Sequence, residues 1–172
     1  MAELILITGG VRSGKSAWAL KAIEHHPQKA FIATSVSLDD EMAERIARHQ
    51  QERGPEWSTI EESTDLVKAL QSIPKEATGV VIDCLTVWLG NLMYEYGEDV
   101  DVFSHLDRLM EALKAYSGTI VLVTNEIGVG IVPVGAMVRK YRDMAGWISQ
   151  RIAKEAKQVV LMVAGYPIFV KS

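Results

Sequence analysis

Residues 4–16 read Leu4-Ile-Leu-Ile-Thr-Gly-Gly-Val-Arg-Ser-Gly-Lys-Ser16, an apolar run that leads directly into a glycine-rich loop. The loop, residues 9–16, fits the pattern G-x-x-x-x-G-K-[ST]. The apolar run predicts a buried strand, and a helix is predicted over about residues 14–25, beginning at the end of the loop. A P-loop requires this order of strand, loop and helix, so the segment predicts a phosphate-binding loop in an α/β protein.

The residue types of the loop explain how it would hold a nucleotide. Its glycines let the backbone fold tightly around an anion, while its N–H groups and the helix N-terminus point at phosphate oxygens. Lys15 would act as a catalytic residue by reaching the β- and γ-phosphates, and the Ser16 hydroxyl would hold Mg²⁺. We therefore expect nucleotide contacts along the whole loop, at Gly9, Gly10, Val11, Arg12, Ser13, Gly14, Lys15 and Ser16.

A magnesium site of this type also needs a carboxylate at the end of another buried strand. Asp83 follows the apolar run Val80-Val81-Ile82 and meets that requirement. Asp is also a common helix cap, and a helix is predicted to begin near Leu85, so both roles are open for Asp83. Cys84 is interpreted as a small buried residue rather than a nucleophile, because no histidine lies nearby in the sequence.

Short apolar runs alternate with helical patterns along the whole chain. The runs predict strands over residues 4–8, 30–34, 80–84, 120–124 and 159–163, with 168–171 as a candidate antiparallel edge strand. The helical patterns cover about residues 14–25, 39–53, 64–72, 85–95, 101–116 and 136–157. The apolar face predicted for the last helix is formed by Val138, Tyr141, Met144, Ala145, Ile148 and Ile152. This alternation predicts an α/β fold of the P-loop NTPase type, with a mostly parallel sheet and helices on both faces.

The composition excludes several classes of protein. A chain of 172 residues that is 48% hydrophobic and 23% charged is expected to form one domain, over residues 1–172, rather than a disordered segment. Its net charge of −4 argues against a protein that mainly binds nucleic acid or an anionic membrane. The single cysteine excludes a disulfide framework and predicts a reducing compartment, the cytoplasm. No apolar stretch reaches the length that a membrane span needs.

A P-loop by itself does not define a reaction. GTPase switches read guanine with an Asn-Lys-x-Asp element, but Asn91 and Asn125, the two asparagines of the chain, are followed by Leu and Glu. ATPases that move along DNA need a basic surface, which the net charge argues against. The sequence therefore favours chemistry on small molecules.

Residues 39–53 carry a second informative pattern. Glu41, Arg45, His49 and Arg53 step by four along one helical face. One interpretation is a solvated face with Glu–Arg pairs. The other is a nucleophile, because a neutral imidazole can attack a phosphorus atom near pH 7 while neighbouring arginines neutralise phosphate oxygens. The pattern alone leaves both interpretations open.

An ordered set of motifs runs nearly from one end of the chain to the other. It comprises Thr8-Gly-Gly-Val-Arg-Ser-Gly-Lys-Ser16, Ile32-Ala-Thr-Ser35, Asp40-Glu-Met-Ala-Glu-Arg-Ile-x-x-His49, Trp57-x-Thr-x-Glu61, Asp83-Cys-Leu-Thr86 with Asn91-Leu92, Thr124-Asn-Glu-Ile-Gly-Val-Gly-Ile-Val-Pro133 and Arg142-Asp-Met-Ala-Gly146. In this set the chain resembles the bifunctional adenosylcobinamide kinase/adenosylcobinamide-phosphate guanylyltransferases of cobalamin biosynthesis. One departure is Ser149-Gln150, where family members often have Asn-Gln.

The resemblance implies two reactions on one scaffold. In the first, the γ-phosphoryl group of ATP or GTP passes to the hydroxyl of the aminopropanol arm of adenosylcobinamide. In the second, a histidine attacks GTP at its α-phosphorus and pyrophosphate leaves. The GMP held on the histidine then passes to adenosylcobinamide phosphate, which gives adenosyl-GDP-cobinamide.

The resemblance also assigns residues and partners. The guanylylated histidine falls on His49, which favours the nucleophile interpretation of that residue. Besides the P-loop, the GTP contacts fall on Ala33, Thr34, Ser35, Gln50, Gln51, Glu52, Arg53, Glu61 and Asp83. Mg²⁺ is expected with ATP or GTP at Ser16 and Asp83. The expected partners are these nucleotides, adenosylcobinamide and its phosphate, without nucleic acid, in a homo-oligomer for which the family suggests a trimer.

Some assignments stay open. Asn125 and Glu126 follow a predicted strand and are read either as strand-end turn residues or as substrate or catalytic residues. Trp57, Trp88 and Trp147 are expected to pack in the core or at an interface. Two other functions remain as alternatives, a P-loop kinase of another small metabolite and a nucleotide-dependent binding module.

Overall fold

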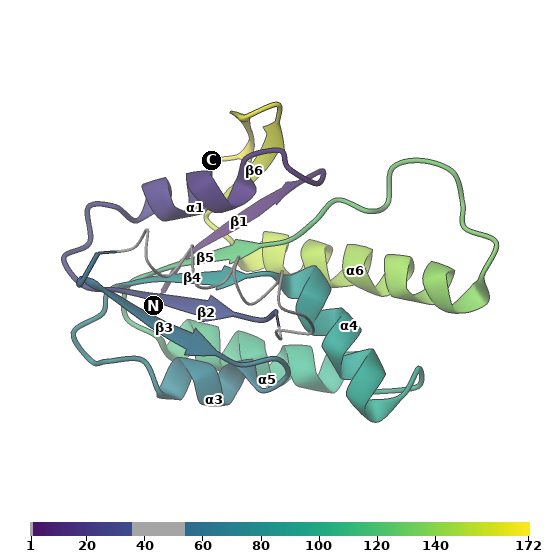
Figure 1. Ribbon diagram of the computed structural model, residues 1–172, viewed down its shortest axis with the longest axis horizontal. Coiled ribbons are helices and arrows are strands. Elements are labelled where there is room, and N and C mark those ends of the chain that lie inside the picture. Colours follow the sequence, from purple (N-terminus) through teal and green to yellow (C-terminus); the bar gives the residue numbers. More distant parts are fainter. Residues whose placement is uncertain (1, 36–53) are drawn as a thin grey trace.

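The computed structural model describes residues 2–35 and 54–172, and its strands form a seven-stranded sheet (Figure 1). The strand order is β3-β2-β4-β5-β1-β6-β7. The strands are β1 (Glu3–Gly9), β2 (Lys29–Ala33), β3 (Trp57–Glu61), β4 (Gly79–Asp83), β5 (Thr119–Val123), β6 (Gln158–Val163) and β7 (Tyr166–Lys171). Neighbouring strands pair in parallel except β6 and β7, which pair antiparallel. Because β1 lies between β5 and β6, the loop after β1 has the carboxyl end of another strand on each side.

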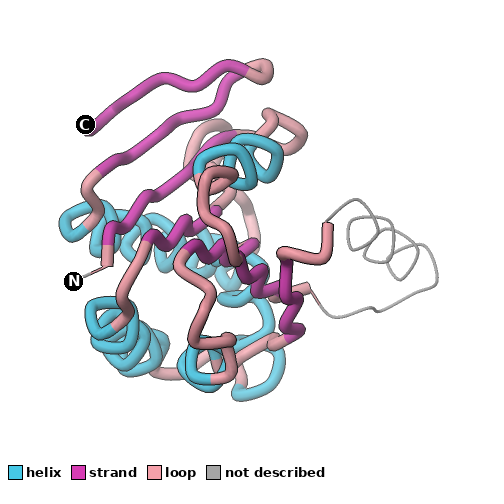
Figure 2. Tube along the Cα trace, turned by 90° about the vertical axis from the view of Figure 1, so that its left-hand side faces the viewer, coloured by secondary structure: helices cyan, strands magenta, loops and turns pink. Residues whose placement is uncertain are grey.

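Helices cover both faces of this sheet (Figures 1 and 2). One face carries α1 (Lys15–Ala22), and the opposite face carries α3 (Leu66–Gln71), α4 (Leu85–Tyr96), α5 (Val102–Ala115) and α6 (Ala136–Glu155). Strand β1 contributes to both layers, because Leu4 and Leu6 pack in the core under the four helices whereas Ile5 and Ile7 pack beside α1. Such strands are buried on both faces, which is why they read as continuous apolar runs.

The fold class predicted from the sequence is confirmed. Each predicted strand is present with bounds within two residues of the prediction, and the C-terminal edge strand is antiparallel as expected. The predicted helices are present with bounds within three residues, except the one over 39–53, which lies outside the described residues. The alternation of apolar runs and helical patterns was therefore enough to predict the fold class and most of the elements.

The sequence patterns do not predict β3, and this omission is wrong. Trp57–Glu61 pairs in parallel with β2 and forms the edge of the sheet beyond it. The residues of β3 are only half-buried or exposed, and Ser58, Thr59 and Glu61 interrupt its apolar character. An edge strand with one partner does not need two apolar faces, so it lacks the continuous run by which the other parallel strands were found.

Strands β6 and β7 form a tight hairpin that extends the sheet. Val163 pairs with Tyr166, which leaves Ala164 and Gly165 as a two-residue loop. Both loop residues have positive φ, 50° and 86°, as a type I′ hairpin turn requires. The hairpin also contacts the P-loop, because the Gly165 N–H donates to the Ser13 carbonyl at 3.0 Å. The C-terminal strands therefore brace the loop after β1.

The apolar face of α6 is buried only along its carboxyl-terminal part. Met144, Ala145, Ile148 and Ile152 pack in the core as predicted, whereas Val138 is exposed, so its predicted place on the buried face is wrong. The first turns of this 20-residue helix extend beyond the strands that it covers (Figure 1), because the strands have only five to seven residues. Among the described residues, no helix combines the length and apolar character that crossing a membrane needs.

The packing of α4 generates a stability prediction. Leu89 is fully buried beneath the sheet, whereas Tyr94, five residues later on the same helix, is 92% exposed. We expect Leu89→Ala to lower the free energy of unfolding by about 2–5 kcal/mol, because it removes buried apolar atoms and leaves a cavity. Tyr94→Ala is the matched control and should change it by less than about 0.5 kcal/mol. Equilibrium urea unfolding measures both values, and equal effects would contradict this packing.

Candidate active site

The carboxyl ends of the parallel strands lie along one edge of the sheet, where open α/β sheets bind ligands. In the pairing register, Ala33 at the end of β2 lies beside Asp83 of β4 on one side and Glu61 of β3 on the other. Glu61 belongs to β3, and four strand spacings separate β3 from β1, which at the usual strand spacing is about 19 Å. Glu61 therefore lies on the predicted edge but too far away to contact the same phosphate as the P-loop.

The loop after β1 has the tight backbone that its sequence predicts. Arg12 and Gly14 adopt positive φ values of 57° and 96°, and the Ser13 N–H donates to the Gly10 carbonyl at 3.3 Å. Gly9 has no room for a side chain, because a Cβ atom there would lie 2.5 Å from the Met162 carbonyl oxygen of β6. The loop is thus held against the neighbouring strand in a way that a larger residue at position 9 would prevent.

The first turn of α1 offers an anion site at this loop. Gly14 is the N-cap residue, and no side chain caps the helix. The N–H groups of a helix's first turn have no partner within the helix, and the helix dipole favours negative charge at that end. An uncapped N-terminus after a glycine-rich loop is the arrangement by which such loops bind phosphate.

Lys15, the first residue of α1, points back into the loop. Its Nζ atom donates to the Gly10 carbonyl at 2.6 Å, and the residue is buried. Burial lowers the pKa of its ammonium group, while the nearby Asp83 carboxylate and Cys84 act in the opposite direction. The ammonium group therefore lies inside the space that the loop encloses, where it would meet a phosphate oxygen.

Ser16 and Asp83 come together although 67 residues separate them in the chain. The Ser16 hydroxyl donates to Asp83 Oδ2 at 2.6 Å. A hydroxyl and a carboxylate at the mouth of a phosphate loop are the oxygen donors that Mg²⁺ prefers. The two residues predicted to hold the metal thus fit such an ion by their chemistry and by their proximity.

The alternative role of Asp83, as a cap for the helix that follows, is not observed. Helix α4 begins at Leu85 with Cys84 as its N-cap, and no side chain forms a cap hydrogen bond. The peptide bond between Asp83 and Cys84 is cis. The Asp83 side chain is turned toward Ser16 instead.

Cys84 is buried, as interpreted from the sequence. Its Sγ atom lies 3.1 Å from Thr86 Oγ1. Burial and the neighbouring Asp83 carboxylate raise the pKa of the thiol, while hydrogen bonds from Thr86 and Val87 partly offset this rise. A thiol with a raised pKa is a poor nucleophile, so the structure assigns Cys84 to the core.

Residues after β5 complete this edge of the sheet. Asn125 Nδ2 donates to Thr86 Oγ1 at 3.0 Å, and the Tyr141 hydroxyl of α6 donates to the Thr86 carbonyl at 2.6 Å. Glu126 accepts from the Gly128 N–H at 2.7 Å through its carboxylate, and its own N–H donates to the Gly9 carbonyl at 3.0 Å. Asn125 and Glu126 thus make the strand-end contacts that were one of their two interpretations.

Several predicted site residues are placed differently or not at all. Thr34 is completely buried, with its hydroxyl bonded to the Cys84 backbone rather than turned to the edge of the sheet. Ser35 is the last described residue before the gap. The predictions for His49, Gln50, Gln51, Glu52 and Arg53 lie outside the described residues. Sequence patterns also did not predict the roles of Tyr141 and Gly165, because both contacts join distant elements and leave no local signal.

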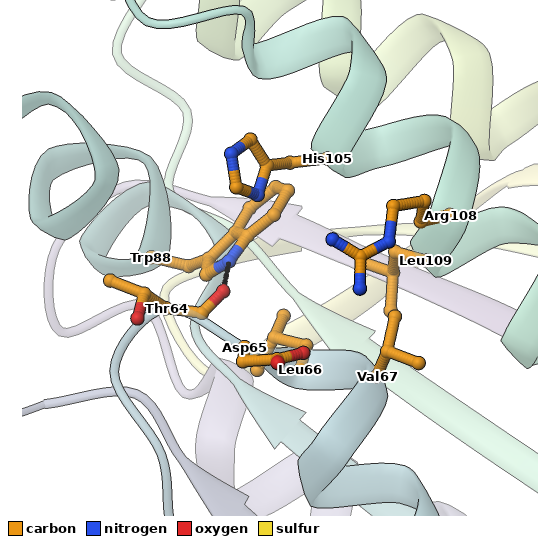
Figure 3. A pocket seen from close by; sticks show the side chains of 8 residues that line it. All are labelled: Thr64, Asp65, Leu66, Val67, Trp88, His105, Arg108 and Leu109. Carbon is orange, nitrogen blue, oxygen red and sulfur yellow. Dashed lines mark hydrogen bonds between the residues drawn. The ribbon is translucent and has the colours of Figure 1, made fainter. Parts of the chain in front are cut away.

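A small cavity elsewhere does not belong to this site. It lies between α3, α4 and α5 and is shown in Figure 3, where the Trp88 Nε1–H donates to the Thr64 carbonyl at 2.8 Å. Trp88 is buried in the core, as expected from the sequence, and the cavity contains no P-loop residue. Trp57 is half-buried beside Lys29, whereas Trp147 is exposed and lies against Phe103.

Comparison with known protein families decides the identity of this arrangement. Residues 5–170 match the CobU family, described as cobinamide kinase / cobinamide phosphate guanyltransferase. The chain belongs to this family. The match spans the P-loop, Asp83 and the segment with His49, so the resemblance expected from the sequence motifs is confirmed.

Individual relatives cover the CobU-family chain almost completely. The bifunctional adenosylcobalamin biosynthesis protein CobU of Escherichia coli is 37% identical and covers 98% of this chain and 99% of its own length. The bifunctional adenosylcobalamin biosynthesis protein CobP of Pseudomonas aeruginosa is 40% identical over 96% of each chain. A crystal structure of the RadB recombinase has a TM-score of 0.52, covers 92% of this chain and 73% of its own, and is 15% identical. This last likeness is one of fold alone.

The surroundings of Cys84 predict slow chemical modification. It is the single cysteine of the chain, so a thiol reagent reports on it alone. At pH 8 we expect it to react at least about tenfold more slowly in the folded protein than in urea, because burial restricts access and the raised pKa lowers the thiolate fraction. Because the pKa is raised, the reaction rate should keep increasing with pH at values where an ordinary thiol is already fully ionised. Equal rates in folded and unfolded protein would contradict the burial of this side chain.

Proposed function

We propose that this protein is a bifunctional enzyme that first phosphorylates adenosylcobinamide and then transfers GMP from GTP to the phosphorylated product, giving adenosyl-GDP-cobinamide and pyrophosphate. The observation that carries the proposal is the family match over residues 5–170, and the contacts of Lys15, Ser16 and Asp83 fit a nucleotide site in that family. The names of the bifunctional relatives, which cover nearly the whole chain, support both activities in one protein. We place both reactions in a single domain over residues 1–172.

In the kinase step, the substrate hydroxyl oxygen forms a bond to the γ-phosphorus of ATP or GTP. The bond from this phosphorus to the bridging β-oxygen breaks, the nucleoside diphosphate leaves and the hydroxyl loses its proton. The N–H groups of residues 9–16 would bind the phosphates, and the Lys15 ammonium group would neutralise charge on the β- and γ-oxygens. Ser16 and Asp83 would hold Mg²⁺, which supplies further charge neutralisation when bound. This step needs no protein nucleophile.

In the guanylyl step, a His49 ring nitrogen forms a bond to the α-phosphorus of GTP and pyrophosphate leaves. A phosphate oxygen of adenosylcobinamide phosphate then attacks the same phosphorus, and the bond to the imidazole breaks. A phosphoramidate is reactive enough for this second transfer, and that chemistry supports a histidine in this role. The assignment to His49 rests on the resemblance of residues 40–49 to the family motif.

The remaining nucleotide contacts are proposals of the same kind. Ala33, Ser35 and Glu61 lie at or near the ends of β2 and β3, along the same edge as the P-loop. The separation of Glu61 from the P-loop, four strand spacings, supports a contact with a part of the nucleotide other than the phosphates. Gln50, Gln51, Glu52 and Arg53 are assigned from the resemblance alone.

We further infer that the protein acts in the cytoplasm as a homo-oligomer, a trimer by family resemblance. Exposed apolar side chains support an association of subunits. In the loop between β5 and α6, Ile131 and Val134 are 96% and 97% exposed, and Phe169 of edge strand β7 is also exposed. Apolar groups gathered at a surface are typical of interaction sites.

A nucleotide bound covalently to the protein would distinguish the proposed bifunctional enzyme from a kinase that has only the first activity. After incubation with α-labelled GTP and Mg²⁺ followed by denaturation, we expect label on the protein that is labile to acid and stable to base, as a phosphoramidate is. His49→Ala should abolish the label, and the exposed His25→Ala should keep it as a matched control. Absence of label on the wild-type protein would reject the guanylyl step and favour a P-loop kinase or a binding module.

The kinase step is tested at Lys15. We expect Lys15→Ala to lower kcat for phosphorylation of adenosylcobinamide by about 100-fold or more, because it removes a charge from the reacting phosphates. Lys21→Ala is the control, since Lys21 is exposed in the last turn of the same helix. Transfer of label from γ-labelled ATP measures both rates. A rate for Lys15→Ala within about fivefold of wild type would contradict the role of the P-loop.

A further inference from the structure

Thr34 follows β2 and makes its polar contacts with the backbone of Asp83 and Cys84. Its N–H donates to the Asp83 carbonyl at 3.1 Å. Its hydroxyl accepts from the Cys84 N–H at 2.8 Å and donates to the Cys84 carbonyl at 2.8 Å. The residue is completely buried, and one oxygen atom serves as both acceptor and donor. The side chain thus continues the pairing of β2 with β4 for one residue past the end of both strands.

We propose that Thr34 is a positioning residue for the Asp83 carboxylate and, through it, for the Mg²⁺ that Ser16 and Asp83 would hold. The proposal rests on the proposed function only in that it assumes a magnesium nucleotide at this site. Asp83 is the last residue of β4, so the strand pairing no longer holds the backbone directly after it. The direction of the Asp83 side chain depends on the backbone at this point. The three hydrogen bonds from Thr34 hold both the carbonyl of Asp83 and the next residue. They restrict the backbone from which the carboxylate extends toward Ser16.

Thr34 is itself fixed by a side chain of α4, a helix that covers one face of the sheet. Asn91 of α4 donates through Nδ2 to the Thr34 carbonyl at 2.8 Å and to the Ser63 carbonyl at 3.0 Å. The end of β2 and the segment after β3 are therefore tied to the same helix. Because the backbone of Thr34 is held in this way, its hydrogen bonds can keep the backbone of Asp83 and Cys84 in a fixed position relative to the sheet.

The geometry distinguishes positioning from a direct contact with the nucleotide. A direct contact needs an exposed polar atom, but Thr34 is 0% exposed and its hydroxyl is already bonded as donor and acceptor. Serine keeps both functions, because its hydroxyl oxygen is also a donor and an acceptor. Valine would fill nearly the same space while leaving the Cys84 N–H and carbonyl without these partners.

The experiment measures GTP affinity by isothermal titration calorimetry, in Mg²⁺ and in EDTA, for wild type and variants. We define the Mg²⁺ gain as the ratio of GTP affinity in Mg²⁺ to that in EDTA. We expect Thr34→Val to reduce this gain by about 10- to 100-fold, as substitutions of residues that hold a metal ligand do. The affinity in EDTA should not change. Thr34→Ser keeps the hydroxyl and should retain the gain. Thr78→Val is the matched control, because Thr78 bonds to His26 at the opposite edge of the sheet and should also retain it.

Four results would overturn the proposal. They are a full Mg²⁺ gain in Thr34→Val, an equal loss in Mg²⁺ and EDTA, which would indicate a direct nucleotide contact, loss of the gain in Thr34→Ser, and no gain in wild type. Circular dichroism checks folding, and Thr34→Ala replaces the valine variant if that variant does not fold. The readout needs neither reaction. A protein without kinase or guanylyl activity would reject the proposed function and leave the role of Thr34 to be judged by these affinities.

Discussion

The hydrogen bond from Ser16 to Asp83 is the interaction around which the candidate site is built. Ser16 lies in the first turn of α1, directly after the P-loop, and Asp83 lies at the end of a strand separated from β1 by β5. The two side chains meet only because β4, β5 and β1 pair in parallel and end at the same edge. The register of the sheet is therefore a precondition for a shared metal site. A shift of one residue would also turn each strand's side chains to the wrong face.

Polar side chains of α4, of α6 and of the segment after β5 hold this edge of the sheet together. Asn91 ties the end of β2 to α4, and Asn125 and Tyr141 tie Thr86 to β5 and α6. Beyond the ends of the strands, these side-chain hydrogen bonds take the place of the backbone hydrogen bonds between strands. Buried polar groups without partners are costly, so a set in which donors and acceptors are matched favours one arrangement of the loops over others. These contacts thus support the backbone around the candidate active site.

The predicted parts of the site differ in how local their signals are. The P-loop is defined by eight consecutive residues, and Asp83 by its place at the end of an apolar run, so both were found. The edge strand β3 was missed because Ser58, Thr59 and Glu61 interrupt its apolar character. Val138 was placed wrongly because periodicity shows which residues share a helix face but not how far the sheet extends beneath it. The contact of Gly165 with the P-loop left no pattern at all.

From the sequence alone follow the α/β class, the phosphate loop, the candidate metal ligands and the family whose motifs the chain carries, because each depends on residue types at short and regular spacing. Only the tertiary structure decided that Asp83 turns to Ser16 rather than capping α4, that Thr34 is buried against the Cys84 backbone, and that the C-terminal hairpin braces the loop. These outcomes depend on strand order and on pairing between residues far apart in the chain. Such pairings are set by the packing of the whole sheet, and no local stretch of sequence specifies them.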